Sequence, residues 1–455
     1  MADANTSTTT VRMRVRMKAR SIDEPDRVAS QLELLFDLTF VVAIASATDQ
    51  LARSVAGGDA LEGLPSFLQV FFAIWWAWMN FTWFASSYDT DDVAYRVLTL
   101  VQMAGVLVLS AGVPPAFAHG DYRAVGVGYA MMRIGLVAQW VRAGIEDTGS
   151  RSTALRYAVA IGLVQFGWLL FAFAAGGLPP GTRAPGFVLL AALELAIPRW
   201  AERAGPTNWH PHHIAERYGL FTIILLGEVV LAATTAVQRA MQATRISVPL
   251  VTISGCALLL VFAHWWLYFL HPAAPGLLAR REHSYRWGYG HYAIFTAVAA
   301  LGAGLDVAVE QTAGHTHASP TTVGYAVAIP MAVFVLALRA VHQSISNTSI
   351  LRGPAVLGWV VVVLLLPLAT PWTGAAVTVA ALTAAAVLLT AGTTIGRARE
   401  SRDGRTCGVG VERTEGPVNS HSGSRHPGER ADRIGAWNRD ESDPSTSARL
   451  PPHPP

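Results

Sequence analysis

Twelve long apolar stretches, separated by short polar segments, constrain this chain more than any other feature of its sequence. A helix needs about 20 mostly apolar residues to cross a bilayer. The composition agrees, because 52% of the 455 residues are hydrophobic and 14% are charged, against roughly 25% charged in soluble domains. We therefore predict an all-α transmembrane fold of about twelve helices. The expected spans are residues 34–52, 67–87, 95–117, 122–143, 154–176, 185–201, 214–237, 247–270, 288–309, 321–341, 354–372 and 374–396.

Positive charge between the spans predicts how the chain is oriented. If the N-terminus lies inside, the outer loops hold only Arg53, Arg123, Arg183, Arg239 and Arg245, and the other loop arginines lie inside. Cytoplasmic loops of membrane proteins are enriched in Lys and Arg. We therefore expect an even number of spans with both termini in the cytoplasm.

The two ends of the chain differ in composition from the spans. Residues 1–30 are polar and basic, and residues 397–455 are rich in Gly, Ser, Pro, Arg and Asp. Segments with too little apolar surface to bury stay unfolded. We therefore predict a disordered basic cytoplasmic arm and a disordered cytoplasmic tail. Beside a membrane helix, the arm is expected to touch anionic lipid rather than nucleic acid.

Four short matches in the same order indicate an internal repeat. The matched pairs are FAIWWAW at 72–78 with FAHWWLY at 262–268, Tyr95-Arg96 with Tyr285-Arg286, VGYA at 127–130 with VGYA at 323–326, and, more loosely, ELLFDL at 33–38 with YGLFTI at 218–223. Because six helices are an even number, both units would enter the membrane from the same side, as in some transporters. We predict two parallel six-helix repeats, residues 31–209 and 210–396.

Two further motifs carry a family resemblance. The first span reads ELLFDLTFVVAIA from Glu33, and the seventh reads HIAERYGLFTIILLGE from His213 to Glu228. Both resemble motifs of the bacterial low temperature requirement A family, with Leu35 where Phe is usual and Val229 where Ser is often found. The resemblance covers about residues 31–396 and implies a multi-pass protein of the bacterial inner membrane. The family name records a growth phenotype and implies no reaction or substrate.

A fainter likeness is to the bacterial and lysosomal potassium channels that carry an F-S-D motif in the first helix of each six-helix repeat. Phe36-Asp37 would correspond to that motif, but the serine is missing. The second copy reads Phe221-Thr222, so this likeness adds little to the prediction.

Three ionisable residues are placed near mid-membrane by these spans: Arg133 in the fourth, Glu194 in the sixth and Glu228 in the seventh. Intramembrane charges are costly and usually functional. We therefore predict a central polar site at which a carboxylate loads and releases a proton or an ion. Glu228 stands out, about 18 Å above Glu216 along its helix, with Arg133 as its expected partner. The alternative is a structural ion pair of Arg133 with Glu228 or Glu194.

Five titratable residues lie near the cytoplasmic ends of the first and seventh spans: Glu33, Asp37, His213, Glu216 and Arg217. Glu33 and Asp37 are four residues apart and face one way on a helix. The five could line a cytoplasmic approach to the central site. Their position at the membrane boundary favours the alternative, a network of ion pairs at the helix ends.

Tryptophans within the spans and histidines near the cytoplasmic side are further candidate site residues. Trp75, Trp76 and Trp78 are expected to pack in the core, with an aromatic cavity as the alternative. Only His212 and Glu216 have helical i,i+4 ligand spacing, and the repeated histidine boxes of membrane di-metal enzymes are missing. No phosphate-binding loop, dinucleotide fingerprint or nucleophile elbow occurs. We expect no metal, no cofactor and no catalytic residues.

The leading interpretation is a secondary transporter or channel-like protein for a small ion or solute, and not an enzyme. One alternative is a membrane-embedded enzyme that uses His212, His213, Glu216 and His283. Another is a non-catalytic membrane scaffold or stress protein. A polar cavity reaching Glu228 would favour transport, and convergence of the four enzyme candidates would favour catalysis. A tightly packed interior would favour the scaffold.

Overall fold

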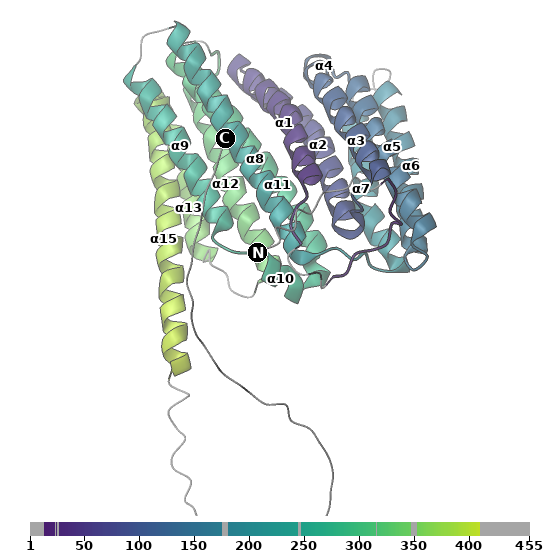
Figure 1. The fold of residues 1–455 in the computed structure, drawn as a ribbon. Helices are drawn as coiled ribbons and strands as arrows, with labels where there is room; N and C mark the ends of the chain where they lie inside the picture. The colour runs from purple at the N-terminus through teal and green to yellow at the C-terminus, as the bar shows by residue number, and fades with distance from the viewer. Residues whose placement is uncertain are drawn as a thin grey trace, which may run out of the picture. The chain divides into compact units, whose positions relative to one another are not determined.

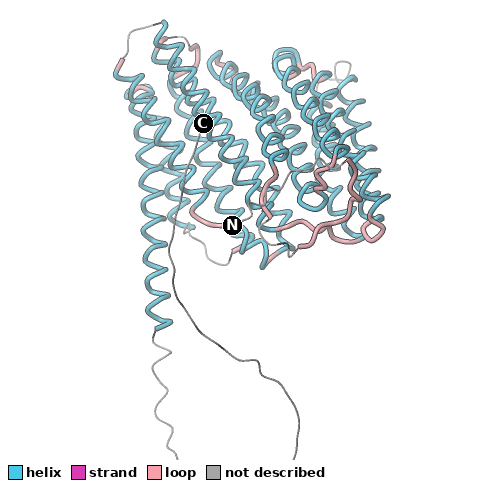
Figure 2. The backbone as a smooth tube through the Cα atoms, in the orientation of Figure 1, coloured by secondary structure: helices cyan, strands magenta, loops and turns pink. Residues whose placement is uncertain are grey.

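A computed structural model describes residues 13–22, 24, 27–174, 181–243, 247–314, 316–346 and 353–409. Residues 1–400 form one compact unit and residues 401–455 a second, of which only the end of the last helix is described. Helices and loops make up the described residues, which contain no strand (Figure 1, Figure 2). The predicted all-α class is confirmed.

Twelve helices in the described part of the chain are long and apolar enough to cross a membrane. The helices of the first half are α1 (Gln31–Gly57), α2 (Ala60–Tyr88), α3 (Val93–Ala111), α4 (Val113–His119), α5 (Arg123–Glu146), α6 (Arg151–Ala174), α7 (Arg183–Ala201) and η2 (Glu202–Ala204). Those of the second half are α8 (Pro211–Ala243), α9 (Val248–Phe269), α10 (Ala274–Ala279), η3 (Arg281–His283), α11 (Ser284–Thr312), α12 (Pro320–Ile345), α13 (Gly353–Leu365), η4 (Leu366–Ala369), α14 (Thr370–Thr373) and α15 (Ala375–Val409). Each predicted span coincides with one of the twelve, so the chain is a multi-pass membrane protein.

Local sequence signals set both ends of α1. The Ser30 side chain accepts a hydrogen bond from the Glu33 amide, and the Glu33 carboxylate accepts one from the Ser30 amide, which is a capping box. At the other end Gly58 has a φ of 95°, a left-handed conformation that glycine adopts without steric cost. The capping box holds the Glu33 side chain at the start of α1, where groups from α8 also reach it.

Neighbouring helices pack in a similar pattern in the two halves (Figure 1). α1 packs on α2 and α3, and α3 packs on α5; likewise α8 packs on α9 and α11, and α11 packs on α12. The halves meet where α1 contacts α8 and α11, and α11 is buried along most of its length. This pattern agrees with the predicted repeat, which stays a prediction.

Residues 13–22 and 27–30 form an ordered segment, which we call the arm. Its backbone amides at Val15 and Met17 donate hydrogen bonds to Asp92 at 2.8 Å and Glu146 at 2.6 Å. The Met17 side chain is fully buried. The order of these residues differs from the disordered arm expected over residues 1–30. The segment has few apolar residues, but carboxylates at the helix ends accept hydrogen bonds from its backbone. Residues 1–12 lie outside the described part.

The end of the chain also departs from the expected boundary. α15 continues to Val409, whereas the predicted tail begins at residue 397. Most of that tail, residues 410–455, lies outside the described residues.

The ends of the helices define two faces of the molecule. The helix ends beside the arm form the arm face, and the other ends form the opposite face. α2 runs from the opposite face at Ala60 to the arm face at Tyr88, since the Arg20 amide donates to the Ser87 carbonyl at 2.9 Å. α7 also ends at the arm face, because Asn208, which follows it, donates to the Arg20 carbonyl at 3.2 Å.

Candidate functional site

Arg133 and Glu194 form an ion pair inside the first half. Arg133 Nη2 lies 3.3 Å from Glu194 Oε2, and the two side chains are 2% and 0% exposed. The carboxylate also accepts hydrogen bonds from Trp76 Nε1 at 2.7 Å, from the Tyr129 hydroxyl at 3.2 Å and from Trp168 Nε1 at 3.2 Å. Four helices, α2, α5, α6 and α7, therefore converge on one carboxylate, and we call these five residues the Arg133–Glu194 cluster.

Burial makes this cluster costly to disrupt. A guanidinium and a carboxylate held out of water stabilise each other, and removing one leaves an unpaired buried charge at a cost of about 3–5 kcal/mol. Nε and Nη1 of Arg133 have no hydrogen-bond partner among the described residues. Arg133 therefore keeps donors that water or a solute could use.

Two cavities lie on either side of the cluster along the helix axes. The opposite-face cavity, of about 40 Å³, is lined in part by Ala73 and Phe187. The arm-face cavity, of about 30 Å³, is lined in part by Asn80 and Glu202. On α2 the order is Ala73, Trp76, Asn80, and from α7 into η2 it is Phe187, Glu194, Glu202. The cluster therefore lies between two spaces that share α2, α5, α6 and α7 as walls, and α11 adds a further wall to the arm-face cavity.

Glu228 lies elsewhere, at the contact of α8 with α1 and α11. It is 4% exposed, and a Cβ added at Gly302 would lie 3.6 Å from its Oε2. Thr48 lies beside it, and Asp306 acts on it electrostatically. No ion pair joins Glu228 to a described cation, and the partner of Arg133 is Glu194.

The predicted pairing of Glu228 with Arg133 is therefore wrong. Equal depth in the membrane does not bring two helices together. α8 packs mainly on α1, α9 and α11, whereas α5, which carries Arg133, packs mainly on α3 and α6. Of the three predicted central residues, the structure brings together Arg133 and Glu194.

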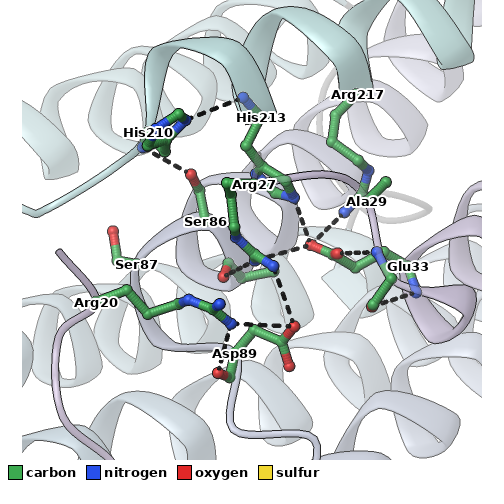
Figure 3. Close-up of polar contacts among 12 residues, drawn as sticks. Arg20, Arg27, Ala29, Glu33, Ser86, Ser87, Asp89, His210, His213 and Arg217 are labelled. Carbon is green, nitrogen blue, oxygen red and sulfur yellow. Dashed lines mark hydrogen bonds and ion pairs between the residues drawn. The ribbon is translucent and has the colours of Figure 1, made fainter. Parts of the chain in front are cut away.

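A second buried cluster joins α1 to α8 near the arm face (Figure 3). Arg217 Nη1 lies 2.8 Å from Glu33 Oε1, and Arg217 Nε donates to Asp37 Oδ2 at 2.9 Å. His213 Nε2 lies 3.0 Å from the same Glu33 oxygen, and Trp78 Nε1 donates to Asp37 Oδ1 at 2.7 Å. We call this the Arg217 network. It brings together four of the five residues expected on the approach, in a set of ion pairs between the two halves.

The network continues to the arm face through Arg27 and Asp89 (Figure 3). Arg27 lies 3.8 Å from Glu33 and 3.5 Å from Asp89. Asp89 follows α2, and burial together with the negative charge of Glu33 raises the pKa of Asp89 to about 6. Glu216, the fifth expected residue, instead accepts a hydrogen bond from the Ala29 amide of the arm at 3.1 Å.

Two tryptophans bind carboxylates, a role that was not predicted from the sequence. Trp76 and Trp78 are buried as expected, but their indole nitrogens bind the carboxylates of Glu194 and Asp37. The sequence did contain a signal for this role. A carboxylate in an apolar helix needs a hydrogen-bond donor, and the indole N–H of an otherwise apolar tryptophan side chain supplies one. Glu202, which lines the arm-face cavity, was also missed.

Residues proposed for a metal-dependent enzyme do not converge. Within the described ranges, no group of three or more His, Cys, Asp or Glu side chains could hold a metal ion. His213 faces Glu33 at 3.0 Å, and His283 lies 3.4 Å from Glu282. The His/Glu cluster that this alternative required is not formed.

Known proteins match most of the spanning region. A family model described as Bacterial low temperature requirement A protein matches residues 28–391. An uncharacterized protein of Rhizobium meliloti (strain 1021) is 27% identical over 301 residues, which are 59% of this chain and 68% of that protein. The range that the family model matches contains the Arg133–Glu194 cluster, both cavities and Glu228.

Proposed function

The chain belongs to the bacterial low temperature requirement A family, and we propose that it is a secondary transporter or channel-like protein for a small ion or solute. The observation that supports a transport function is the pair of cavities separated by the Arg133–Glu194 cluster. In this proposal the protein lies in the inner membrane with the arm face and both termini in the cytoplasm. The cavities are the two ends of a path, and the cluster is the barrier between them.

The α7 helix is the part of this barrier that moves. It packs chiefly on α6, yet it carries Glu194 and leads into Glu202, and it contains Pro198 between them. In contrast, α3 and α5 are locked together, since a Cβ on Gly128 would lie 2.3 Å from the Leu109 amide nitrogen. A shift of α7 against the α3–α5 pair would loosen the barrier without unfolding either side.

Glu228 is the candidate for coupling this movement to a proton or an ion. Its carboxylate is buried, its Oε2 has no hydrogen-bond partner, and no ion pair to a described cation balances its charge. It lies where α8 meets α1 and α11, so neutralising it would alter the packing of the two halves. A ligand shifts a conformational equilibrium only by binding the two states differently. A proton or ion on Glu228 would meet that condition if the contact of α8 with α1 and α11 changes when α7 shifts.

Flux through proteoliposomes tests the proposal. A panel of small ions, amines, sugars and amino acids is screened, first without and then with a pH gradient. Glu194→Gln and Arg133→Met weaken the barrier and should raise downhill flux at least about tenfold, while Arg53→Gln, an exposed pair member, should leave it unchanged. Glu228→Gln should keep downhill flux and lose its dependence on pH or on the coupling ion.

A membrane scaffold is the second candidate, because Arg133 is paired and both cavities are small. The same screen separates the two functions. Absence of flux for every solute, with correctly folded protein in the vesicles, would favour the scaffold.

A further inference from the structure

The arm-face cavity contains a carboxylate whose partners are all neutral. Glu202 accepts hydrogen bonds from the hydroxyls of Tyr157 at 3.4 Å, of Thr207 and of Tyr285. A carboxylate offers about four acceptor positions. Three hydroxyl donors therefore leave one position for a further donor.

The described part of the chain pairs no positive charge with this carboxylate. Among the residues that the structure describes, no ion pair within 4 Å reaches Glu202. Arg281 interacts with Glu202 electrostatically but has its contacts at another residue. Arg281 lies over the Trp209 ring, with Cζ 4.0 Å from its centroid, and donates to the Trp209 carbonyl at 3.0 Å. Glu202 thus has hydroxyl donors around it and no ion-pair partner among the described residues.

Aromatic side chains are the largest group in the rest of the lining. The rings of Trp83, Trp140, Tyr157, Tyr285 and Tyr289 line the cavity. Aromatic rings beside a carboxylate attract organic ammonium groups. A hard metal cation would instead require six or more oxygen ligands. The remaining wall is mixed, with apolar groups such as Met79 and Pro198 beside the polar side chains of Asn80, Thr207 and Ser284.

The size of the cavity limits what it can hold. Its volume is about 30 Å³, far below the roughly 300–1,000 Å³ of pockets that bury drug-sized ligands. There is room only for a small group. A primary amine of two or three heavy atoms fits, whereas a quaternary ammonium with four methyl groups does not.

We propose that the arm-face cavity binds a compact protonated amine, with Glu202 as its counter-charge and hydrogen-bond acceptor. The ammonium group donates to the free acceptor position of Glu202, and its alkyl part lies among the rings. That such an amine is the transported solute rests on the function proposed above, but its binding does not. Tyr289, which lines the cavity, packs against Trp76 of the Arg133–Glu194 cluster with ring centroids 5.5 Å apart, so a bound amine would occupy the entrance to the path.

Equilibrium binding of radiolabelled methylammonium to the purified full-length protein in detergent tests this site without any flux. We expect saturable binding that Glu202→Gln weakens at least about tenfold, the loss of one charge-assisted hydrogen bond. Glu202→Asp should weaken it less, because the charge is kept. Glu282→Gln is the matched control, since its side chain is 69% exposed on the same face, and it should bind as the parent protein does.

A second variant fills the cavity and keeps the carboxylate. Ser284 lines the cavity and is 4% exposed, so Ser284→Met should block binding even if Glu202→Gln fails to fold. Ethylammonium should compete, and tetramethylammonium and K⁺ at equal concentration should not. Binding that survives both variants, or that K⁺ displaces equally well, would overturn the proposal. Binding without transport of methylammonium would leave the site intact and count against its role in the proposed path.

Discussion

Replacing Glu194 with glutamine should destabilise the protein strongly, although the two side chains have nearly the same shape. The substitution creates no cavity, but it removes the negative charge that faces Arg133, whose side chain is 2% exposed. It also turns one of two acceptor oxygens into a donor, directed at one of the N–H or O–H groups of Trp76, Tyr129 or Trp168. An unpaired buried charge costs about 3–5 kcal/mol.

The double variant Arg133→Met with Glu194→Gln isolates the charge pair. Replacing a buried ion pair by groups of similar volume is often neutral, so the double variant should recover most of the loss. We expect a coupling energy of about 2–3 kcal/mol, at the upper end for residues in contact. The assay is the free energy of unfolding of purified protein, from SDS titration in mixed micelles followed by circular dichroism.

Glu62→Gln is the matched control, because Glu62 is exposed in the first turn of α2. It should change the free energy of unfolding by no more than about 0.5 kcal/mol. The reasoning is refuted if Glu194→Gln costs less than about 1 kcal/mol, or if the two single losses at Arg133 and Glu194 simply add in the double variant.

Three further predictions concern the arm face. Arg217→Lys should lower the free energy of unfolding by several kcal/mol, about 3 or more, because lysine cannot bridge both carboxylates of α1; a near-neutral result in SDS titration would contradict this. Because the pKa of Asp89 is raised to about 6, its contribution to stability is complete below about pH 4 and is lost as the pH rises through 6. Asp89→Asn should flatten that part of the stability profile between pH 4 and 7, and an unchanged profile would count against the burial of this carboxyl. Asp92→Asn should weaken the docking of the arm, seen as faster hydrogen exchange at the Val15 amide, while Asp91→Asn should not.

The spans were predictable because burial in lipid imposes a length and a composition on each helix. The sequence also indicated which acids lie deep, since depth follows from position along a helix. It did not indicate which helices touch. Glu194 and Glu228 have similar depth, but only Glu194 meets Arg133, because the lateral order of helices depends on packing that hydropathy does not record.

The contacts of the arm and of Glu33 are two further features that could not be fully predicted from the sequence. The composition of residues 1–30 predicts an unfolded segment. In the structure the arm docks because its backbone amides donate hydrogen bonds to Asp92 and Glu146, and backbone hydrogen bonds cannot be predicted from composition. The capping box at Ser30 and Glu33 was readable as S-x-x-E before an apolar run. The ion pair of Glu33 with Arg217 could not be predicted, because Arg217 follows Glu33 by 184 residues in the chain.

The central claim is that two cavities open to opposite sides of the membrane across the Arg133–Glu194 cluster. Side-specific thiol labelling tests it most directly, in a background where Cys256 and Cys407 are replaced by serine. Ala73→Cys places a thiol in the opposite-face cavity and Ser284→Cys places one in the arm-face cavity. With a membrane-impermeant methanethiosulfonate reagent, we predict that the first is modified only in right-side-out vesicles and the second only in inverted vesicles. Modification of neither thiol, or of both from the same side, would contradict the account.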